Sequence, residues 1–94
     1  MNIAIVGLGI IGGSYCKALK SYTKHTVTGI NRTEAVAQKA LEAGAIDRIG
    51  TPESLAEQDI IILCMYPQAC LDFLRENGKF IRMALILKLL AENA

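Results

Sequence analysis

The sequence predicts an α/β protein in which helices cover both faces of a doubly wound parallel sheet. Short runs rich in Ile and Val alternate with segments whose apolar residues follow a helical period. This alternation requires right-handed crossovers between parallel strands. A glycine-rich turn joins the first run to the first helical segment. The chain has 94 residues, of which 52% are hydrophobic, and we therefore expect a single domain with a modest core.

The first four elements are predicted from apolar spacing and from helix-end residues. Asn2 to Val6 is a β-branched run that indicates a strand buried on both faces. Ile10 to Tyr22 has apolar residues at helical spacing, and Thr26 to Ile30 is the second strand. The next helix spans Glu34 to Ala43, with Thr33 as its N-cap and a glycine after its last residue.

The next four elements repeat the alternation. Ala45 to Gly50 can hold a short third strand. Thr51 precedes a proline at the first position of a short helix that runs through Gln58. Asp59 to Met65 is the most strongly apolar strand, and Pro67 to Asn77 is a helix that glycine ends.

The last segment departs from the pattern. A doubly wound sheet places another strand shortly after Gly78, yet Arg82 to Ala94 consists almost wholly of strong helix formers. The sequence therefore predicts the first half of the fold only, with a helical C-terminal tail at residues 82–94.

Composition excludes several classes of protein. Ten Lys and Arg side chains balance nine Asp and Glu, which argues against a nucleic-acid binder or a polybasic membrane protein. No apolar run is long enough to span a bilayer, and the N-terminus lacks the pattern of a secretory signal. Three cysteines without metal-ligand spacing indicate reduced thiols. We expect a cytoplasmic protein.

A six-residue glycine pattern is the strongest functional signal. It follows a predicted strand, opens a predicted helix and reads Gly7-Leu8-Gly9-Ile10-Ile11-Gly12. The first glycine permits a tight turn, the second lets the backbone approach a pyrophosphate, and the third lets the helix pack near the strand. Amides at the helix start would bind the phosphates. The pattern predicts a Rossmann-like dinucleotide site, although glycines used for turn geometry alone would look the same.

The end of the second strand predicts which cofactor is bound. An NAD site usually has Asp or Glu there, whereas this chain has Asn31, followed by Arg32 and Thr33. A neutral amide does not repel a 2′-phosphate, and a guanidinium offers it a planar cationic fork. We therefore expect NADP rather than NAD, the alternative being an Asn turn beside a solvent-facing Arg.

The end of the fourth strand adds further candidates. Cys64, Met65 and Tyr66 lie at the sheet edge where open α/β sheets bind ligands, and their backbone could line the cofactor. Tyr66 serves equally well as a packing residue, and the cysteines are predicted to be small core residues. His25, in a polar turn, is expected to be solvated rather than catalytic. Other catalytic and metal-binding candidates are absent.

The string from Ile3 to Ser14, with its double glycine and serine, closely resembles the start of prephenate and arogenate dehydrogenases. Similar strings follow at Val27 to Arg32, Ala43 to Asp47 and Asp59 to Cys64. The resemblance covers about residues 2–81, and we assign residues 1–81 to a dinucleotide-binding domain. In 6-phosphogluconate dehydrogenases an Asn-Arg-Thr or Asn-Arg-Ser at the second strand accompanies NADP, which supports the choice of NADP over NAD.

The resemblance implies an oxidoreductase of tyrosine biosynthesis that passes hydride to the nicotinamide with loss of carbon dioxide. The family's catalytic histidine lies in a glycine-histidine-proline segment that is missing here, and His25 does not match it. We therefore expect an NADP-binding fragment that is inactive by itself. Three alternatives stay open: a stand-alone regulatory nucleotide-binding module, the cofactor domain of another dehydrogenase such as a 6-phosphogluconate dehydrogenase-like protein, and an enzyme whose other half is a separate chain.

The tail suggests one explanation of the departure after Arg82. With one adenine restored, a possible set of codons for Arg82-Met83-Ala84-Leu85 reads Arg-Asn-Gly-Ala, close to the family's continuation. We hypothesise a shifted reading frame after Arg82. Missing strands would leave apolar surface uncovered, so we also expect a homo-oligomer formed through the exposed sheet edge or the tail.

Overall fold

The computed structural model describes residues 1–9, 16–21, 23–81 and 85–88. Residues 16–21 are helical. The other elements, in chain order, are β1 (Asn2–Val6), β2 (Thr26–Ile30), α2 (Glu34–Glu42), β3 (Arg48–Ile49), the 3-10 helix η1 (Pro52–Glu57), β4 (Ile60–Leu63), α3 (Pro67–Asn77), the 3-10 helix η2 (Gly78–Phe80) and β5 (Leu85–Lys88).

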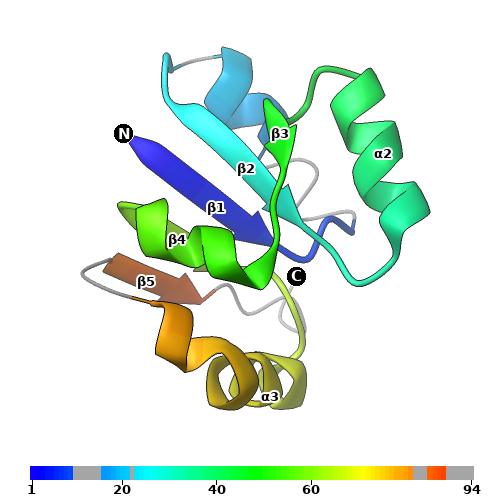
Figure 1. Cartoon of the computed structure of the whole chain (residues 1–94). Coiled ribbons are helices and arrows are strands. Elements are labelled where there is room, and N and C mark those ends of the chain that lie inside the picture. The colour runs from blue at the N-terminus through cyan, green and yellow to red at the C-terminus, as the bar shows by residue number, and fades with distance from the viewer. Residues whose placement is uncertain (10–15, 22, 82–84, 89–94) are drawn as a thin grey trace.

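The strands form one five-stranded sheet in the order β3-β2-β1-β4-β5 (Figure 1). Every neighbouring pair is parallel, with Ile3 opposite Val27 on one side of β1 and opposite Ile60 on the other. The carboxyl ends of β1, β2 and β4 therefore meet at one edge of the sheet. This edge is where open α/β sheets bind ligands.

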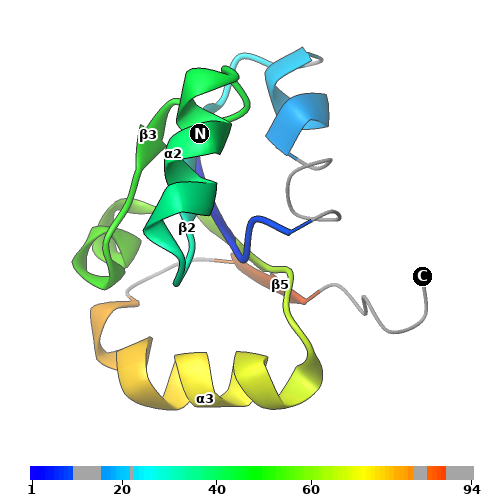
Figure 2. The same cartoon turned by 90° about the vertical axis from the view of Figure 1, so that its right-hand side faces the viewer.

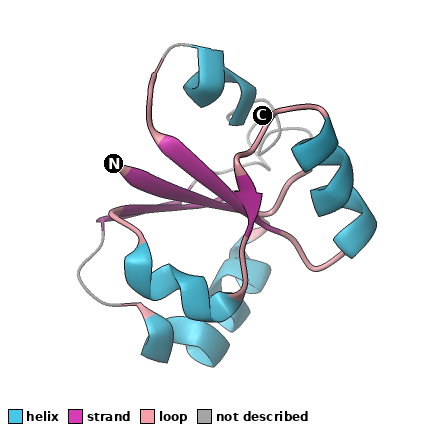
Figure 3. Ribbon diagram, turned by 45° about the horizontal axis from the view of Figure 1, so that its top comes forward, coloured by secondary structure: helices cyan, strands magenta, loops and turns pink. Residues whose placement is uncertain are grey.

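Helices cover both faces of the sheet (Figures 2 and 3). The helical residues 16–21 and α2 lie on one face, while η1, α3 and η2 lie on the other. Side chains alternate along β1, so that Ile3 and Ile5 belong to the first core and Ala4 and Val6 to the second. Because both faces are buried, the four buried residues from Ile3 to Val6 are all apolar.

The structure confirms the doubly wound parallel sheet and most element positions. β2 and α3 have the predicted bounds, and α2 ends one residue earlier than predicted. The third strand shortens to Arg48–Ile49, and the helix that Pro52 begins is a 3-10 helix. The fourth strand shortens to Ile60–Leu63. Within the predicted helix from Ile10 to Tyr22, the structure describes residues 16–21, and these are helical.

The prediction of a helical tail is wrong for residues 85–88. Leu85–Lys88 is a strand, parallel to β4, with Leu85 opposite Ile60 and Lys88 opposite Leu63. Helix propensity is a weak preference that tertiary context overrides, and the outer edge of β4 offers a row of backbone hydrogen-bonding groups. The sheet therefore continues beyond its first half. The rest of the tail lies outside the described residues.

No helix among the described residues is long and apolar enough to cross a membrane.

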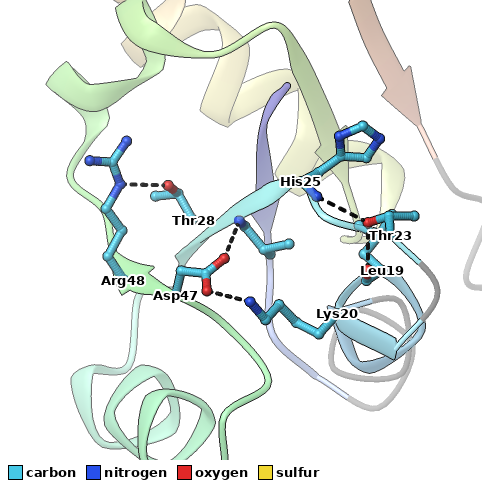
Figure 4. A network of polar contacts seen from close by, with 8 residues as sticks. Leu19, Lys20, Thr23, His25, Thr28, Asp47 and Arg48 are labelled. Carbon is cyan, nitrogen blue, oxygen red and sulfur yellow. Dashed lines mark hydrogen bonds and ion pairs between the residues drawn. The ribbon is translucent and has the colours of Figure 1, made fainter.

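Asp47 joins the helical residues 16–21 to β2 by hydrogen bonds and an ion pair (Figure 4). One carboxylate oxygen pairs with Lys20 of the helical residues 16–21, and the other accepts the backbone N–H of Val27 in β2 at 2.7 Å. The Asp47 N–H in turn donates to the carbonyl of Val27 at 2.8 Å. The hydrogen bond from Lys20, followed by that from the Val27 amide, lowers the pKa of Asp47.

Replacing Asp47 by Asn should destabilise the fold by about 1 kcal/mol at pH 7, because the charge-assisted hydrogen bonds are lost. Since the folded-state pKa is lowered, the contribution of Asp47 is present above its unfolded pKa and disappears as pH falls through the folded pKa. Urea unfolding at pH 7 and pH 3 measures this. An equal difference between wild type and Asp47→Asn at both pH values would contradict it.

Candidate functional site

A cleft of about 630 Å³ opens at the carboxyl edge of the sheet. It lies where β1 and β4, which are neighbours in the sheet, continue toward helices on opposite faces. Such a switch point is the usual ligand position in open α/β sheets, and the volume suits a small molecule or cofactor. The described lining residues are Val6, Gly7, Ile30, Asn31, Arg32, Gly50, Thr51, Pro52, Met65, Ala69, Asp72, Phe73, Glu76 and Asn77.

Gly7 makes the sharp turn at the end of β1. Its φ is +93°, and its N–H donates to the carbonyl of Ile30 at 2.8 Å. A Cβ on this residue would lie 2.7 Å from the carbonyl oxygen of Cys64 and 2.8 Å from Cγ of Met65. Glycine is therefore needed both for the backbone conformation and for the close approach of β1 to the turn that leaves β4.

Gly9 differs from Gly7 in its surroundings among the described residues. Gly9 is exposed, and a Cβ there would have no described atom within 4 Å. Leu8, between the two glycines, is buried and packs over Gly29 of β2. The predicted site residues Ile10, Ile11 and Gly12 lie outside the described residues.

Asn31 lines the cleft and bonds to backbone on two sides. Its Oδ1 accepts the N–H of Leu8 at 2.8 Å, and its Nδ2 donates to the carbonyl of Thr33 at 3.0 Å. The side chain therefore ties the glycine turn to the loop that begins α2.

Arg32 lines the cleft and is exposed. Among the described residues, the one ion pair joins Lys20 and Asp47. The Arg32 guanidinium therefore has no carboxylate partner there. Thr33 occupies the N-cap position of α2, as predicted, but its hydroxyl makes no capping hydrogen bond and it does not line the cleft. The loop therefore presents one cation at the rim of the cleft.

The three candidate cofactor-binding residues after β4 lie in different surroundings. Met65 lines the cleft, whereas Cys64 and Tyr66 do not. The Cys64 N–H donates to the carbonyl of Val6 at 2.8 Å, and Tyr66 is 70% exposed. His25 is at the amino end of β2, away from the cleft, with Nδ1 3.0 Å from the N-terminal amine of Met1.

Sequence reasoning missed the wall that α3 contributes. Ala69, Asp72, Phe73 and Glu76 all line the cleft. They recur at the spacing of a single helix face, and α3 directly follows the β4 edge, so this stripe could have been found from the predicted helix. The wall combines apolar surface with the carboxylates of Asp72 and Glu76.

The cysteines are structural, as predicted from their apolar surroundings. Cys16 and Cys70 are buried, and Cys64 is half-buried. Burial raises the pKa of Cys16 to about 12 and that of Cys64 to about 11. Among the described residues, no group of His, Cys, Asp and Glu side chains could hold a metal ion.

Comparison with known proteins identifies relatives of this arrangement. The family model for the nucleotide-binding domain of prephenate dehydrogenase matches residues 15–88. A crystal structure of Synechocystis arogenate dehydrogenase is 29% identical with a TM-score of 0.90, over 97% of this chain and 33% of that one. No curated protein sequence matches the chain.

Two further structures share the fold. Prephenate dehydrogenase from A. aeolicus, in complex with hydroxyphenyl propionate and NAD+, is 22% identical with a TM-score of 0.82, over 94% of this chain and 32% of that one. Mycobacterium tuberculosis 3-hydroxyisobutyrate dehydrogenase is 23% identical with a TM-score of 0.81, over 93% of this chain and 30% of that one. The chain thus spans about a third of the length of these proteins.

Replacing Gly7 by Ala should destabilise the chain by about 2–4 kcal/mol, because of its positive φ and the collision with the Cys64 carbonyl. The matched variant Gly9→Ala should change stability by less than about 0.5 kcal/mol. Denaturant unfolding of both variants measures this. Equal losses at the two positions would contradict the different surroundings that the structure gives them.

Thiol labelling should leave Cys16 and Cys64 unmodified in the native chain. At pH 8 their raised pKa values keep the thiolate fraction at about one in a thousand or less, and burial blocks access. Mass spectrometry after brief treatment with a maleimide should find them labelled only when denaturant is present. Rapid labelling of either thiol in the folded chain would count against this.

Proposed function

Because the chain belongs to the family of prephenate dehydrogenase nucleotide-binding domains, we propose that it binds a nicotinamide dinucleotide in the cleft. The observation that carries the proposal is that Gly7 and the exposed Arg32 line one cleft, at the ends of two neighbouring strands. A dinucleotide has phosphate and ribose groups that both features would meet.

Different residues around the cleft would bind different parts of the cofactor. The pyrophosphate would lie against the glycine turn that begins at Gly7. The adenosine half would lie between Arg32 and α3, where Met65 and Phe73 supply apolar surface for a base. Nicotinamide, when bound, accepts hydride from a substrate. This chain's residues would hold the cofactor and exclude water from one side of it.

NADP is the proposed cofactor rather than NAD. Asn31 is uncharged, so no carboxylate at the end of β2 repels a 2′-phosphate. Arg32 is exposed at the rim and is free of carboxylate partners among the described residues, which suits a phosphate. Asp72 and Glu76 make the α3 wall of the cleft acidic, so a 2′-phosphate would be held at Arg32 and away from α3.

The complete activity proposed is that of a prephenate or arogenate dehydrogenase, an oxidoreductase of tyrosine biosynthesis. The chain spans about a third of the Synechocystis arogenate dehydrogenase. We propose that it supplies the cofactor-binding part only, and that it is inactive without residues from outside the chain. The domain division at residue 81 stays a prediction. The shifted reading frame after Arg82 also stays a prediction, which sequencing of the gene would decide.

A stand-alone regulatory nucleotide-binding module is the second candidate. A module of this kind should complete its sheet, and the observation that favours it is the pairing of β5 with β4.

We also propose a homo-oligomer, formed through the outer edge of β5, and a cytoplasmic location. Analytical ultracentrifugation would test the oligomer.

Arg32→Ala should weaken NADPH binding by about tenfold or more and change NADH binding by less than about twofold, because only NADPH carries the 2′-phosphate. Calorimetric titration of the wild type should show tighter binding of NADPH than of NADH. Arg75→Ala is the matched control, since Arg75 is exposed on α3 and does not line the cleft.

Tighter binding of NADH by the wild type would overturn the choice of NADP. Failure of the folded wild type to bind either nucleotide would overturn the proposed function itself.

A further inference from the structure

The orientation of the Asn31 amide is determined by its partners. The Leu8 N–H can only donate and the Thr33 carbonyl can only accept, so Oδ1 must face Leu8 and Nδ2 must face Thr33. The two bonds, at 2.8 and 3.0 Å, use one lone pair of the oxygen and one of the two N–H groups. The side chain is half-buried beside the cleft and is engaged before any ligand arrives.

These bonds link the two loops that would recognise phosphate. The glycine turn is held to the end of β2 twice, by Gly7 N–H to the Ile30 carbonyl at 2.8 Å and by Leu8 N–H to Asn31. Leu8 is further anchored by its buried side chain against Gly29. On the other side, the bond from Asn31 to Thr33 closes the turn that carries Arg32.

We propose that Asn31 is a positioning residue that holds the glycine turn and the Arg32 turn in one fixed arrangement. The inference rests on the proposed function, because either nucleotide would need both turns in place, the glycine turn for its pyrophosphate and the Arg32 turn for its adenosine half. Preorganised groups lose less conformational entropy when they bind, so removal of the link weakens affinity without removal of a ligand contact.

The same geometry explains why an aspartate would not serve equally well here. An aspartate oxygen in the place of Nδ2 would lie about 3.0 Å from the Thr33 carbonyl oxygen, with no proton between the two acceptors. The other oxygen could still accept from Leu8. The closure of the Arg32 turn therefore favours the neutral amide over the carboxylate that would repel a 2′-phosphate.

Two variants separate the bonds. Asn31→Leu has similar size and removes both bonds, whereas Asn31→Asp keeps the bond to Leu8 and loses that to Thr33. Asn2→Leu is the matched control, because it removes another amide-to-backbone bond, from Nδ2 to the Glu57 carbonyl at 3.2 Å, at the opposite edge of the sheet. Thermal unfolding of each variant establishes that it is folded.

The readouts are calorimetric titrations with NADPH and NADH, and amide hydrogen exchange of Leu8 measured by NMR without ligand. Asn31→Leu should weaken the binding of both nucleotides by about tenfold and speed amide exchange of Leu8 by about tenfold or more. Asn31→Asp should weaken NADPH by about tenfold or more, with NADH affinity and Leu8 exchange changed by less than about threefold. Asn2→Leu should leave all three quantities unchanged.

Folded Asn31→Leu with wild-type affinity for both nucleotides would overturn the proposal, and so would a loss of NADPH affinity alone, which would indicate direct contact with the 2′-phosphate. If the wild type binds neither nucleotide, the proposed function fails and Leu8 exchange still decides the link. Unchanged exchange in Asn31→Leu would then overturn the positioning role.

Discussion

The close approach of three strand ends at Gly7 is the constraint on which the site depends. Gly7 bonds to the end of β2 through the Ile30 carbonyl, and Cys64, after β4, bonds back to Val6. A Cβ at residue 7 would lie only 2.7 Å from the Cys64 carbonyl oxygen. Because Gly7 permits this close approach, the glycine turn, the Arg32 turn and α3 line one cleft.

That approach is possible because β1 lies in the middle of the sheet and is buried on both faces. Its alternate side chains enter two separate cores, one under α2 and one under α3. The cores hold the two helical layers on opposite faces, so the connections from β1 and β4 diverge and leave a cleft between them. Asp47 contributes at the opposite face from α3 by joining the helical residues 16–21 to β2.

The candidate site was only partly predictable. Gly7, Arg32 and Met65 were predicted from motif and strand-end position, and each lies where that position implies. Asn31 was predicted as a ligand contact, but the sequence could not show its two backbone bonds, which depend on strand pairing and loop closure. The exposure of Tyr66 and the α3 wall depend on how α3 rotates against the sheet, and strand-end reasoning does not specify this.

Local sequence determined the alternation of strands and helices, the bounds of β2 and α3, and the glycine turn, since each depends on apolar spacing, proline or glycine within a few residues. Tertiary structure decided the segment Leu85–Lys88. Its residues favour a helix in isolation, yet they pair with the edge of β4 as β5. A strand obtains its hydrogen bonds from a neighbour distant in sequence, so propensity alone could not reveal it.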